Sequence, residues 1–116
     1  MITIYKNGDQ GLQPAEAVEN GSWVHAVAPT EQDLAVLAGH GVPPEFLSHL
    51  LDLNERPRAE RENDAILLVL HFPYAQGPTA DIPYITVPLT IIVTTDLVVT
   101  SVPMATGFLQ GFASRN

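Results

Sequence analysis

The sequence predicts one α/β domain in which short helices pack on a β-sheet, and three observations lead to that class. The chain has 116 residues, which is enough for one hydrophobic core and too few for two. Seven short segments show the alternating or continuous apolar pattern of β-strands, whereas two segments between residues 29 and 52 show helical spacing. The composition, 46% hydrophobic and 16% charged, is typical of a globular protein.

The first three predicted strands occupy residues 1–27. Met1–Lys6 alternates in polarity as a half-buried strand does, and Asn7-Gly8-Asp9 predicts a turn after it. A second short strand is expected within Gly11–Val18, with a bend at its proline. After a turn at Asn20-Gly21, the strand Trp23–Val27 is expected to place its odd-numbered and even-numbered side chains on opposite faces.

A capping pattern predicts the first helix. Thr30 can accept a hydrogen bond from the amide of Asp33, and the Asp33 carboxylate can accept one from the amide of Thr30. Glu31 and Asp33 therefore have two interpretations, a cation site or a helix cap, and capping explains them without a ligand. The residues expected to face the core are Leu34, Leu37 and Ala38. The glycines of Gly39–Gly41 end the helix.

A second helix is predicted to begin at Pro43-Pro44, because proline is favourable in the first turn of a helix. Apolar residues at helical spacing extend it to about Asp52. Its expected apolar face consists of Phe46, Leu47, Leu50 and Leu51. Both helices are short, so we expect them to gain their stability by packing on the sheet.

The second half of the chain is predicted to be rich in β-structure. Arg58–Glu62 and Ala65–Phe72 are expected to be strands joined at Asn63-Asp64, and Val87–Thr94 and Leu97–Val102 form a hairpin around Thr95-Asp96. The core candidates of the hairpin are Ile91, Val93, Leu97 and Val99. Two further segments are expected to be a surface loop, Ala75–Tyr84, and the start of a helix, Ala105–Ser114.

Charge and composition exclude several classes of function. The net charge of −8 argues against nucleic acid and against docking on an anionic lipid surface. The absence of cysteine excludes disulfides and thiolate metal sites. The longest apolar stretch, Ile82–Val102, contains Pro83, Pro88 and Asp96, so it does not resemble a membrane span of about 20 apolar residues.

The sequence contains no pattern of catalytic residues, and we expect no enzymatic activity. A nucleophile elbow and a glycine-rich phosphate loop are both missing. The four histidines are His25, His40, His49 and His71, and their spacing is not that of a helical zinc pair. His71 lies within a strand, where a hydrogen-bonded structural histidine is expected rather than a metal ligand.

One charged segment, Asp52–Arg61, stands out between the second helix and the buried strand. It contains three of the five basic residues of the chain: Arg56, Arg58 and Arg61. It can be a solvated edge strand whose charges discourage aggregation. Alternatively, it can be an ionic hinge that fastens a strand to a helix, because Arg56 and Arg58 can hold carboxylates in a forked geometry.

The charged segment also carries a resemblance. Its order of residues resembles the amino-terminal signature of the CorA-type divalent-cation transporters: Leu51-Asp52, then Glu55-Arg56-Pro57-Arg58-Ala59-Glu60, and then a hydrophobic strand. Ser22–Val27, Gly41-Val42-Pro43 and the closing pair of strands occur in the same order as in that family. The motif residues, to which the resemblance gives a structural role, are Asp52, Glu55, Arg56, Pro57, Arg58 and Glu60.

The resemblance implies a fold and a position in a larger protein. The fold would be a mixed sheet with short helices packed on it, a truncated form of the α/β/α sandwich of CorA cytoplasmic domains. Residues 1–116 would be a single domain and a fragment of a longer membrane protein whose transmembrane part is absent. The domain would lie at the cytoplasmic face of the membrane and contribute to ion sensing, gating and oligomer assembly.

The resemblance also implies partners. Family members are homopentamers, regulated by divalent cations bound between cytoplasmic domains, so Mg²⁺, Zn²⁺ or Co²⁺ is the expected regulator and no cofactor is required. An acidic pair of the magnesium transporters corresponds here to Ser48 and His49, which weakens the case for a metal site; Glu45 and Asp52 are acids that could substitute.

Two further expectations concern the chain by itself. Without the missing helices, the fragment should expose apolar surface and form dimers or higher oligomers. The alternative function is a free-standing α/β module that senses a small ligand or binds another protein.

Overall fold

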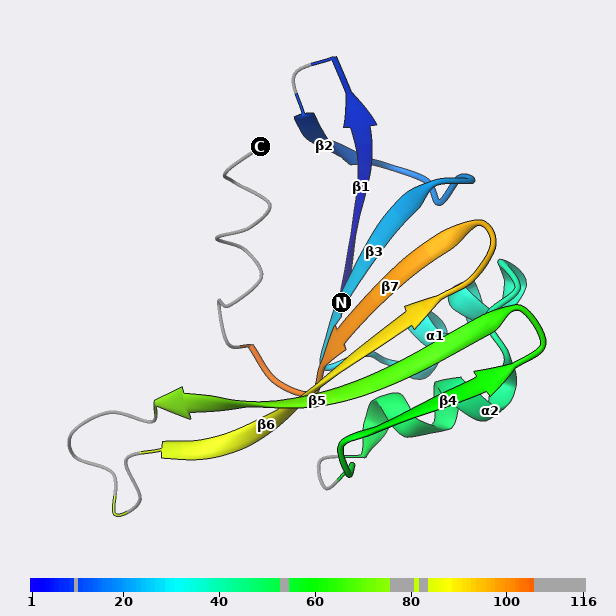
Figure 1. Ribbon diagram of the computed structural model, residues 1–116. Coiled ribbons are helices and arrows are strands. Elements are labelled where there is room, and N and C mark those ends of the chain that lie inside the picture. Colours follow the sequence, from blue (N-terminus) through cyan, green and yellow to red (C-terminus); the bar gives the residue numbers. More distant parts are fainter. Residues whose placement is uncertain (10, 53–54, 76–80, 82–83, 106–116) are drawn as a thin grey trace.

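The computed structural model describes residues 1–9, 11–52, 55–75, 81 and 84–105, and within them seven strands form one sheet. The strands are β1 (Ile2–Gly8), β2 (Gly11–Ala15), β3 (Ser22–Val27), β4 (Arg58–Glu62), β5 (Ala65–Ala75), β6 (Tyr84–Val93) and β7 (Leu97–Val102). Their order across the sheet is β2-β1-β3-β7-β6-β5-β4 (Figure 1). The predicted strands are therefore confirmed, with shifts at their ends.

The sheet is mixed because β3 and β7 are parallel neighbours at its centre, with Val24 opposite Val99. The other pairings are antiparallel. The sheet thus consists of an amino-terminal group of three strands and a carboxy-terminal group of four, joined by the one parallel pair. The mixed sheet that the family resemblance implied is confirmed.

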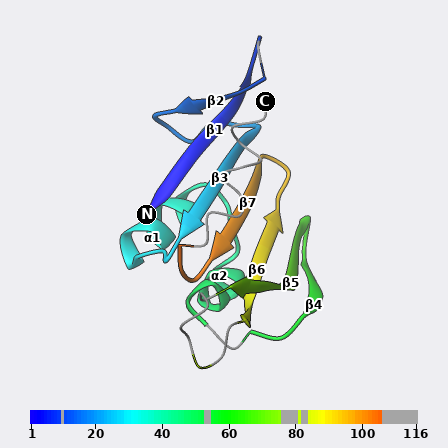
Figure 2. The ribbon, with the colours of Figure 1, turned by 90° about the vertical axis from the view of Figure 1, so that its left-hand side faces the viewer.

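The helices cover one face of this sheet (Figure 2). They are α1 (Glu31–Gly39), α2 (Pro44–Leu47) and the 3₁₀ helix η1 (Ser48–Leu51). The buried core lies between them and the sheet, and it consists of Val24, Leu37, Val42, Phe46, Leu47, Leu50, Ala65, Leu67, Val69, Ile92, Leu97 and Val99. Within the described ranges, no helix is long and apolar enough to cross a membrane.

The start of α1 has the predicted capping box. The Asp33 amide donates to Thr30 Oγ1 at 3.1 Å, and the Thr30 amide donates to Asp33 Oδ2 at 2.9 Å. The same carboxylate oxygen accepts a hydrogen bond from the amino terminus of Met1, also at 2.9 Å. Asp33 is therefore part of a helix cap, which agrees with the interpretation that needs no ligand.

Four residues that were predicted to be buried are exposed or only partly buried. In β6 the fully buried residue is Ile92, while Ile91 is partly exposed and Val93 is 38% exposed. Apolar residues occupy both faces of this strand, so its alternation could not identify the face beneath the helices. Ala38 is exposed because α1 reaches the core mainly through Leu37.

The fourth residue wrongly predicted to be buried is Leu51. This side chain is 52% exposed because the second helix tightens from α2 into the 3₁₀ helix η1, which turns successive side chains by a larger angle. The predicted helix Ala105–Ser114 lies outside the described residues except for Ala105. Most of the predicted loop Ala75–Tyr84 also lies outside them.

Candidate functional site

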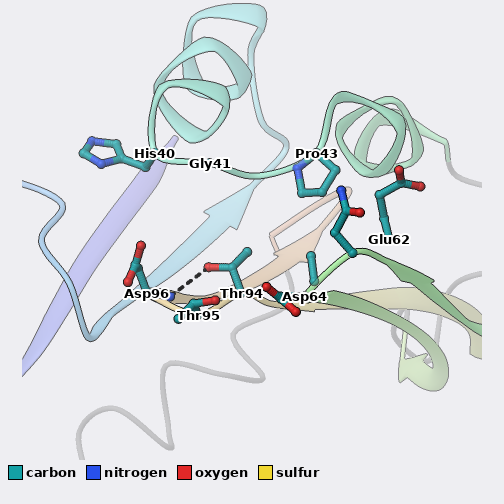
Figure 3. A pocket seen from close by; sticks show the side chains of 10 residues that line it. His40, Gly41, Pro43, Glu62, Asp64, Thr94, Thr95 and Asp96 are labelled. Carbon is teal, nitrogen blue, oxygen red and sulfur yellow. Dashed lines mark hydrogen bonds between the residues drawn. The ribbon is translucent and has the colours of Figure 1, made fainter.

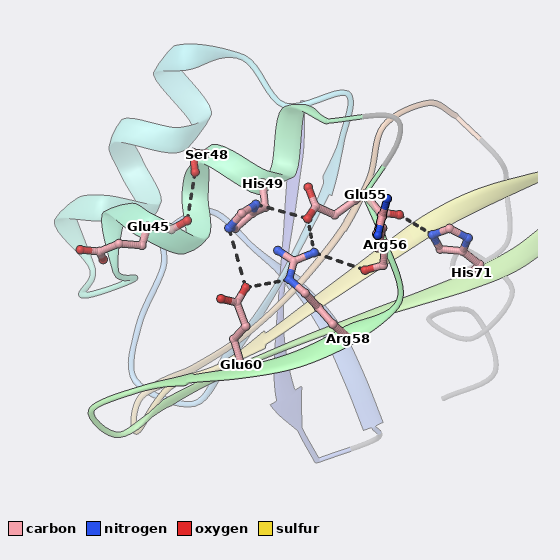
Figure 4. A network of polar contacts seen from close by, with 8 residues as sticks. All are labelled: Glu45, Ser48, His49, Glu55, Arg56, Arg58, Glu60 and His71. Carbon is pink, nitrogen blue, oxygen red and sulfur yellow. Dashed lines mark hydrogen bonds and ion pairs between the residues drawn. The ribbon is translucent and has the colours of Figure 1, made fainter.

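The charged segment connects η1 to the edge strand β4, and its centre is a buried carboxylate. Glu55 is only 6% exposed, although it lies outside helix and strand. Arg58, the first residue of β4, donates from Nη1 to Glu55 Oε1 and from Nε to Glu60 Oε2, the latter at 2.8 Å (Figure 4). One guanidinium therefore holds two carboxylates, as the ionic-hinge interpretation predicted for this residue.

His49 brings the helix into the same network. Its Nδ1 lies 3.3 Å from Glu55 Oε1, and its Nε2 lies 3.8 Å from Glu60 Oε2 (Figure 4). Both ring nitrogens face carboxylate oxygens, so a protonated imidazole would satisfy both contacts. In that state Glu55, Arg58, Glu60 and His49 form a closed cycle of alternating charge, which we call the charge cycle.

The environment of Arg58 changes its proton affinity. Desolvation alone would lower the pKa of this guanidinium, but the hydrogen bonds and charges of Glu60 and Glu55 outweigh it and raise the pKa above its ordinary value. Its Nη2 atom is buried and has no hydrogen-bond partner in the described part of the chain. Arg58 therefore remains a cation, and its position depends on the two glutamates.

The remaining motif residues have other roles. The Arg56 side chain is exposed, and its contribution is a carbonyl oxygen that accepts from Arg58 Nη1 at 3.2 Å. Arg56 was also predicted to hold carboxylates in forked geometry, but its side chain forms no ion pair with the described residues. Pro57 is exposed between these arginines, and Asp52 is the exposed C-cap of η1.

A second histidine fixes the backbone of the charged segment. His71, on β5, donates from Nε2 to the carbonyl oxygen of Glu55. The predicted structural role of His71 is confirmed by this contact. Glu55 is thus held twice, through its carbonyl group by β5 and through its carboxylate by β4 and η1.

Ser48 and His49, which correspond to the acidic pair of the magnesium transporters, both contact other groups of this chain. Ser48 donates to the carbonyl oxygen of Glu45 at 3.0 Å, and His49 belongs to the charge cycle. In the described ranges, no group of three or more His, Cys, Asp or Glu side chains is placed to hold a metal ion.

A small pocket of about 200 Å³ lies at the other end of the helix layer (Figure 3). It opens between the α1–α2 connection, the β4–β5 turn and the β6–β7 turn. Its charged lining consists of Glu62, Asp64 and Asp96, together with the imidazole of His40. These residues come from the end of β4 and from three connections, so no motif in the sequence could indicate that they meet.

Thr94 shapes one wall of this pocket. Its Oγ1 accepts from the amides of Asp96 and Leu97 at 3.2 and 3.0 Å, which closes the β6–β7 turn. Asn63 has a positive φ of 53° in the β4–β5 turn on the opposite wall, a conformation that asparagine tolerates. The pocket is therefore built by turn geometry and not by the packing of the core.

The amino-acid sequence places the chain in a family of transporter proteins. Residues 19–114 match the family model described as CorA-like Mg2+ transporter protein, so the chain belongs to the CorA-like Mg²⁺ transporter family. The resemblance inferred from the charged segment is thereby confirmed. No curated protein has a matching sequence.

Solved structures with the same fold include the following three. The soluble domain of CorA from Methanocaldococcus jannaschii has a TM-score of 0.74 and 19% sequence identity, and the match covers 100% of this chain and 47% of the CorA domain. The cytoplasmic domain of ZntB from Vibrio parahaemolyticus has a TM-score of 0.75 and 15% identity, covering 97% and 47%. The complete CorA magnesium transporter from M. jannaschii has a TM-score of 0.72 and 21% identity, covering 99% and 37%. This chain spans less than half the length of each.

Proposed function

We propose that the chain is the amino-terminal cytoplasmic regulatory domain of a CorA-like divalent metal-ion transporter. It contributes to ion sensing, gating and oligomer assembly, and it catalyses no reaction. The observation that carries this proposal is the family match over residues 19–114, in a chain whose whole length superimposes on the soluble domain of a CorA protein.

The same comparison supports the place of the domain in a longer protein. The chain corresponds to 37% of the complete CorA magnesium transporter, so the membrane-spanning part would belong to other residues of the polypeptide. In that arrangement residues 1–116 form one domain at the cytoplasmic face of the membrane. Five copies assemble around the pore, as the family resemblance implies.

The regulatory cation would be Mg²⁺, Zn²⁺ or Co²⁺, and no other cofactor is needed. The net charge of −8 favours the approach of cations. Ser48 and His49 are not acids, so the acidic pair of the magnesium transporters is missing here, and both side chains contact other groups of this chain. Glu45 is exposed on α2, and Asp52 is exposed at the end of η1. These two acids could substitute for that pair, and they are the first residues to replace in a test.

Cation titration of the purified chain tests the proposal. An ion that binds the folded state alone stabilises it by about 2.7 kcal/mol at one hundred times its dissociation constant, so the melting temperature should rise in a saturable way. Calorimetry with Mg²⁺, Zn²⁺ and Co²⁺ should give the same dissociation constant as the melting curves, with Ca²⁺ as the comparison ion.

Two variants and a control locate the effect. Glu45→Gln and Asp52→Asn should weaken the response, whereas Asp9→Asn, which removes an exposed acid near the β1–β2 turn, should leave it unchanged. A flat response to all three ions would contradict ion sensing by this chain. An equal loss in the Asp9 control would instead indicate a general effect of negative charge.

A further inference from the structure

The imidazole of His49 connects the helix layer to the edge of the sheet. His49 belongs to η1, Glu60 belongs to the edge strand β4, and Glu55 lies in the connection between them. Figure 4 shows the ring with one nitrogen directed at each carboxylate. The side chain of His49 is 32% exposed, so protons from solvent can reach it.

Three charged groups face this ring. Glu55 Oε1 lies 3.3 Å from Nδ1, and Glu60 Oε2 lies 3.8 Å from Nε2. The third group is the guanidinium of Arg58, which contacts the same two carboxylate oxygens from β4. Two further acids, Glu45 and Asp52, lie on the same helical segment as the ring and are exposed.

The balance of charge among these groups depends on one proton. With a neutral imidazole, Glu55 and Glu60 carry two negative charges and Arg58 carries one positive charge, which leaves one negative charge in excess. Glu55 is only 6% exposed, so water screens this excess poorly. Arg58 repels a second cation, but two carboxylates attract it. A proton on His49 therefore brings the four residues to charge balance.

The number of donors on the ring leads to the same conclusion. A neutral imidazole has one N–H donor, and its other nitrogen is an acceptor. It can donate to Glu55 or to Glu60, and its second nitrogen then directs a lone pair at the other carboxylate. A protonated ring has two donors, one for each carboxylate. Both contacts of His49 are thus attractive only when the ring is charged.

From these observations we propose that the charge cycle is a proton-operated latch between η1 and the edge strand β4. In mildly acidic solution the charged ring of His49 fastens η1 to Glu55 and Glu60. In alkaline solution the neutral ring loses its attraction for one of them, and Arg58 alone holds both glutamates. Histidine ordinarily changes its charge between about pH 5 and about pH 8, so the latch operates in the physiological range.

This inference deepens the proposed function and rests on it for the meaning of the position. Ser48 and His49 correspond to the acidic pair of the magnesium transporters. A pair of carboxylates attracts a divalent cation, whereas an imidazole between two carboxylates takes up a proton. At this position the domain therefore responds to pH, in addition to the divalent cation proposed above.

Urea denaturation at about pH 5.5 and about pH 8, on either side of the ordinary titration of histidine, measures the latch. His49→Gln keeps a polar side chain that cannot become charged. The folding equilibrium constant of the wild type should exceed that of His49→Gln by about fivefold at the lower pH, as expected for two partly exposed ion pairs, and the two constants should be nearly equal at the higher pH.

His40→Gln is the matched control. His40 is an exposed histidine after α1, and it forms no ion pair with the residues that the structure describes. The ratio of the wild-type constant to the His40→Gln constant should be the same at both pH values. His25 is present in all of these chains, so its titration cancels in the ratios.

Glu60→Gln shows whether the effect passes through the charge cycle. In this background one of the two ion pairs of His49 is missing, so His49→Gln should cost only about twofold at the lower pH. If His49→Gln is unfolded, the ratio of the wild type to Glu60→Gln replaces it, and this ratio should be larger at the lower pH.

Three results would overturn the proposal: a ratio for His49→Gln that is equal at both pH values, an equal pH dependence in His40→Gln, or a pH dependence that Glu60→Gln leaves unchanged. Cation titration at one fixed pH tests ion sensing separately. A pH response without a cation response would contradict ion sensing alone, and a cation response without a pH response would contradict the latch alone.

Discussion

Replacing Glu55 by glutamine removes one negative charge from the centre of the charge cycle while keeping the size of the side chain. Glu55 is 6% exposed, and its partner Arg58 has a side chain that is 25% exposed. Removing one member of a fully buried ion pair costs about 3–5 kcal/mol, whereas an exposed pair contributes about 0–1 kcal/mol. With one partner buried and the other partly solvated, we expect Glu55→Gln to lower the free energy of unfolding by about 2 kcal/mol.

Glu60→Gln is the matched control, because it removes the other carboxylate bound by Arg58. The Glu60 side chain is 43% exposed, so water replaces much of its interaction, and we expect a loss of about 0.5 kcal/mol or less. Urea denaturation followed by circular dichroism measures both values, provided that the slope with denaturant is unchanged. His71 still donates to the backbone of residue 55 in either variant.

A double-mutant cycle separates the ion pair from other effects. Arg58→Met removes the cation together with its unpartnered Nη2 atom. If Glu55 acts through Arg58, Glu55→Gln should cost about 1 kcal/mol less in the Arg58→Met background than in the wild type. Equal losses for Glu55→Gln and Glu60→Gln, with no coupling to Arg58, would refute the reasoning. The connection would then be held by its backbone contacts alone.

Two other predictions concern local interactions. Thr30→Ala removes the acceptor of the α1 capping box and should lower the free energy of unfolding by about 1 kcal/mol, which thermal denaturation can measure against a Thr30→Ser control that keeps the cap. His25 should make the domain less stable in acid. Desolvation lowers the pKa of this imidazole in the folded state, although the hydrogen bond with Thr100 acts in the opposite direction. Below pH 6.5 the unfolded chain therefore binds more protons than the folded one, and the free energy of unfolding falls as the pH falls. This slope, measured by urea denaturation between pH 7.5 and 5.5, should be smaller in His25→Gln; an identical slope in the variant would assign it to other groups.

The local features of the fold could be predicted from the sequence. The capping box of α1 and the β6–β7 hairpin depend on residues close together in the chain, and the structure confirms both. The face of β6 could not be predicted, because the choice between Ile91 and Ile92 depends on where the helices pack. The family resemblance implied a mixed sheet, but no pattern of residues indicated that β3 and β7 are the parallel pair.

The candidate site was predictable to a smaller extent. The segment and two of its arginines, Arg56 and Arg58, were identified from charge and spacing, but the choice of Arg58 as the one that holds Glu55 and Glu60 was not. The contacts of His49 with Glu55 and Glu60 were not predicted, because they depend on how η1 lies over β4. The conversion of the helix to 3₁₀ geometry at Ser48 determines the direction of that imidazole, and no residue in the segment indicates it.

The parallel pair at the centre of the sheet has a consequence for biosynthesis. His25 on β3 and Thr100 on β7 are in contact although 75 residues separate them. Contacts so distant along the chain form late and slow the folding of a domain. While the protein is being synthesised, the first three strands lack their central neighbour until β7 has left the ribosome. During that interval the apolar residues of β3 remain open to chaperones, and a ribosome that stalls before Leu97 releases a chain unable to complete its sheet.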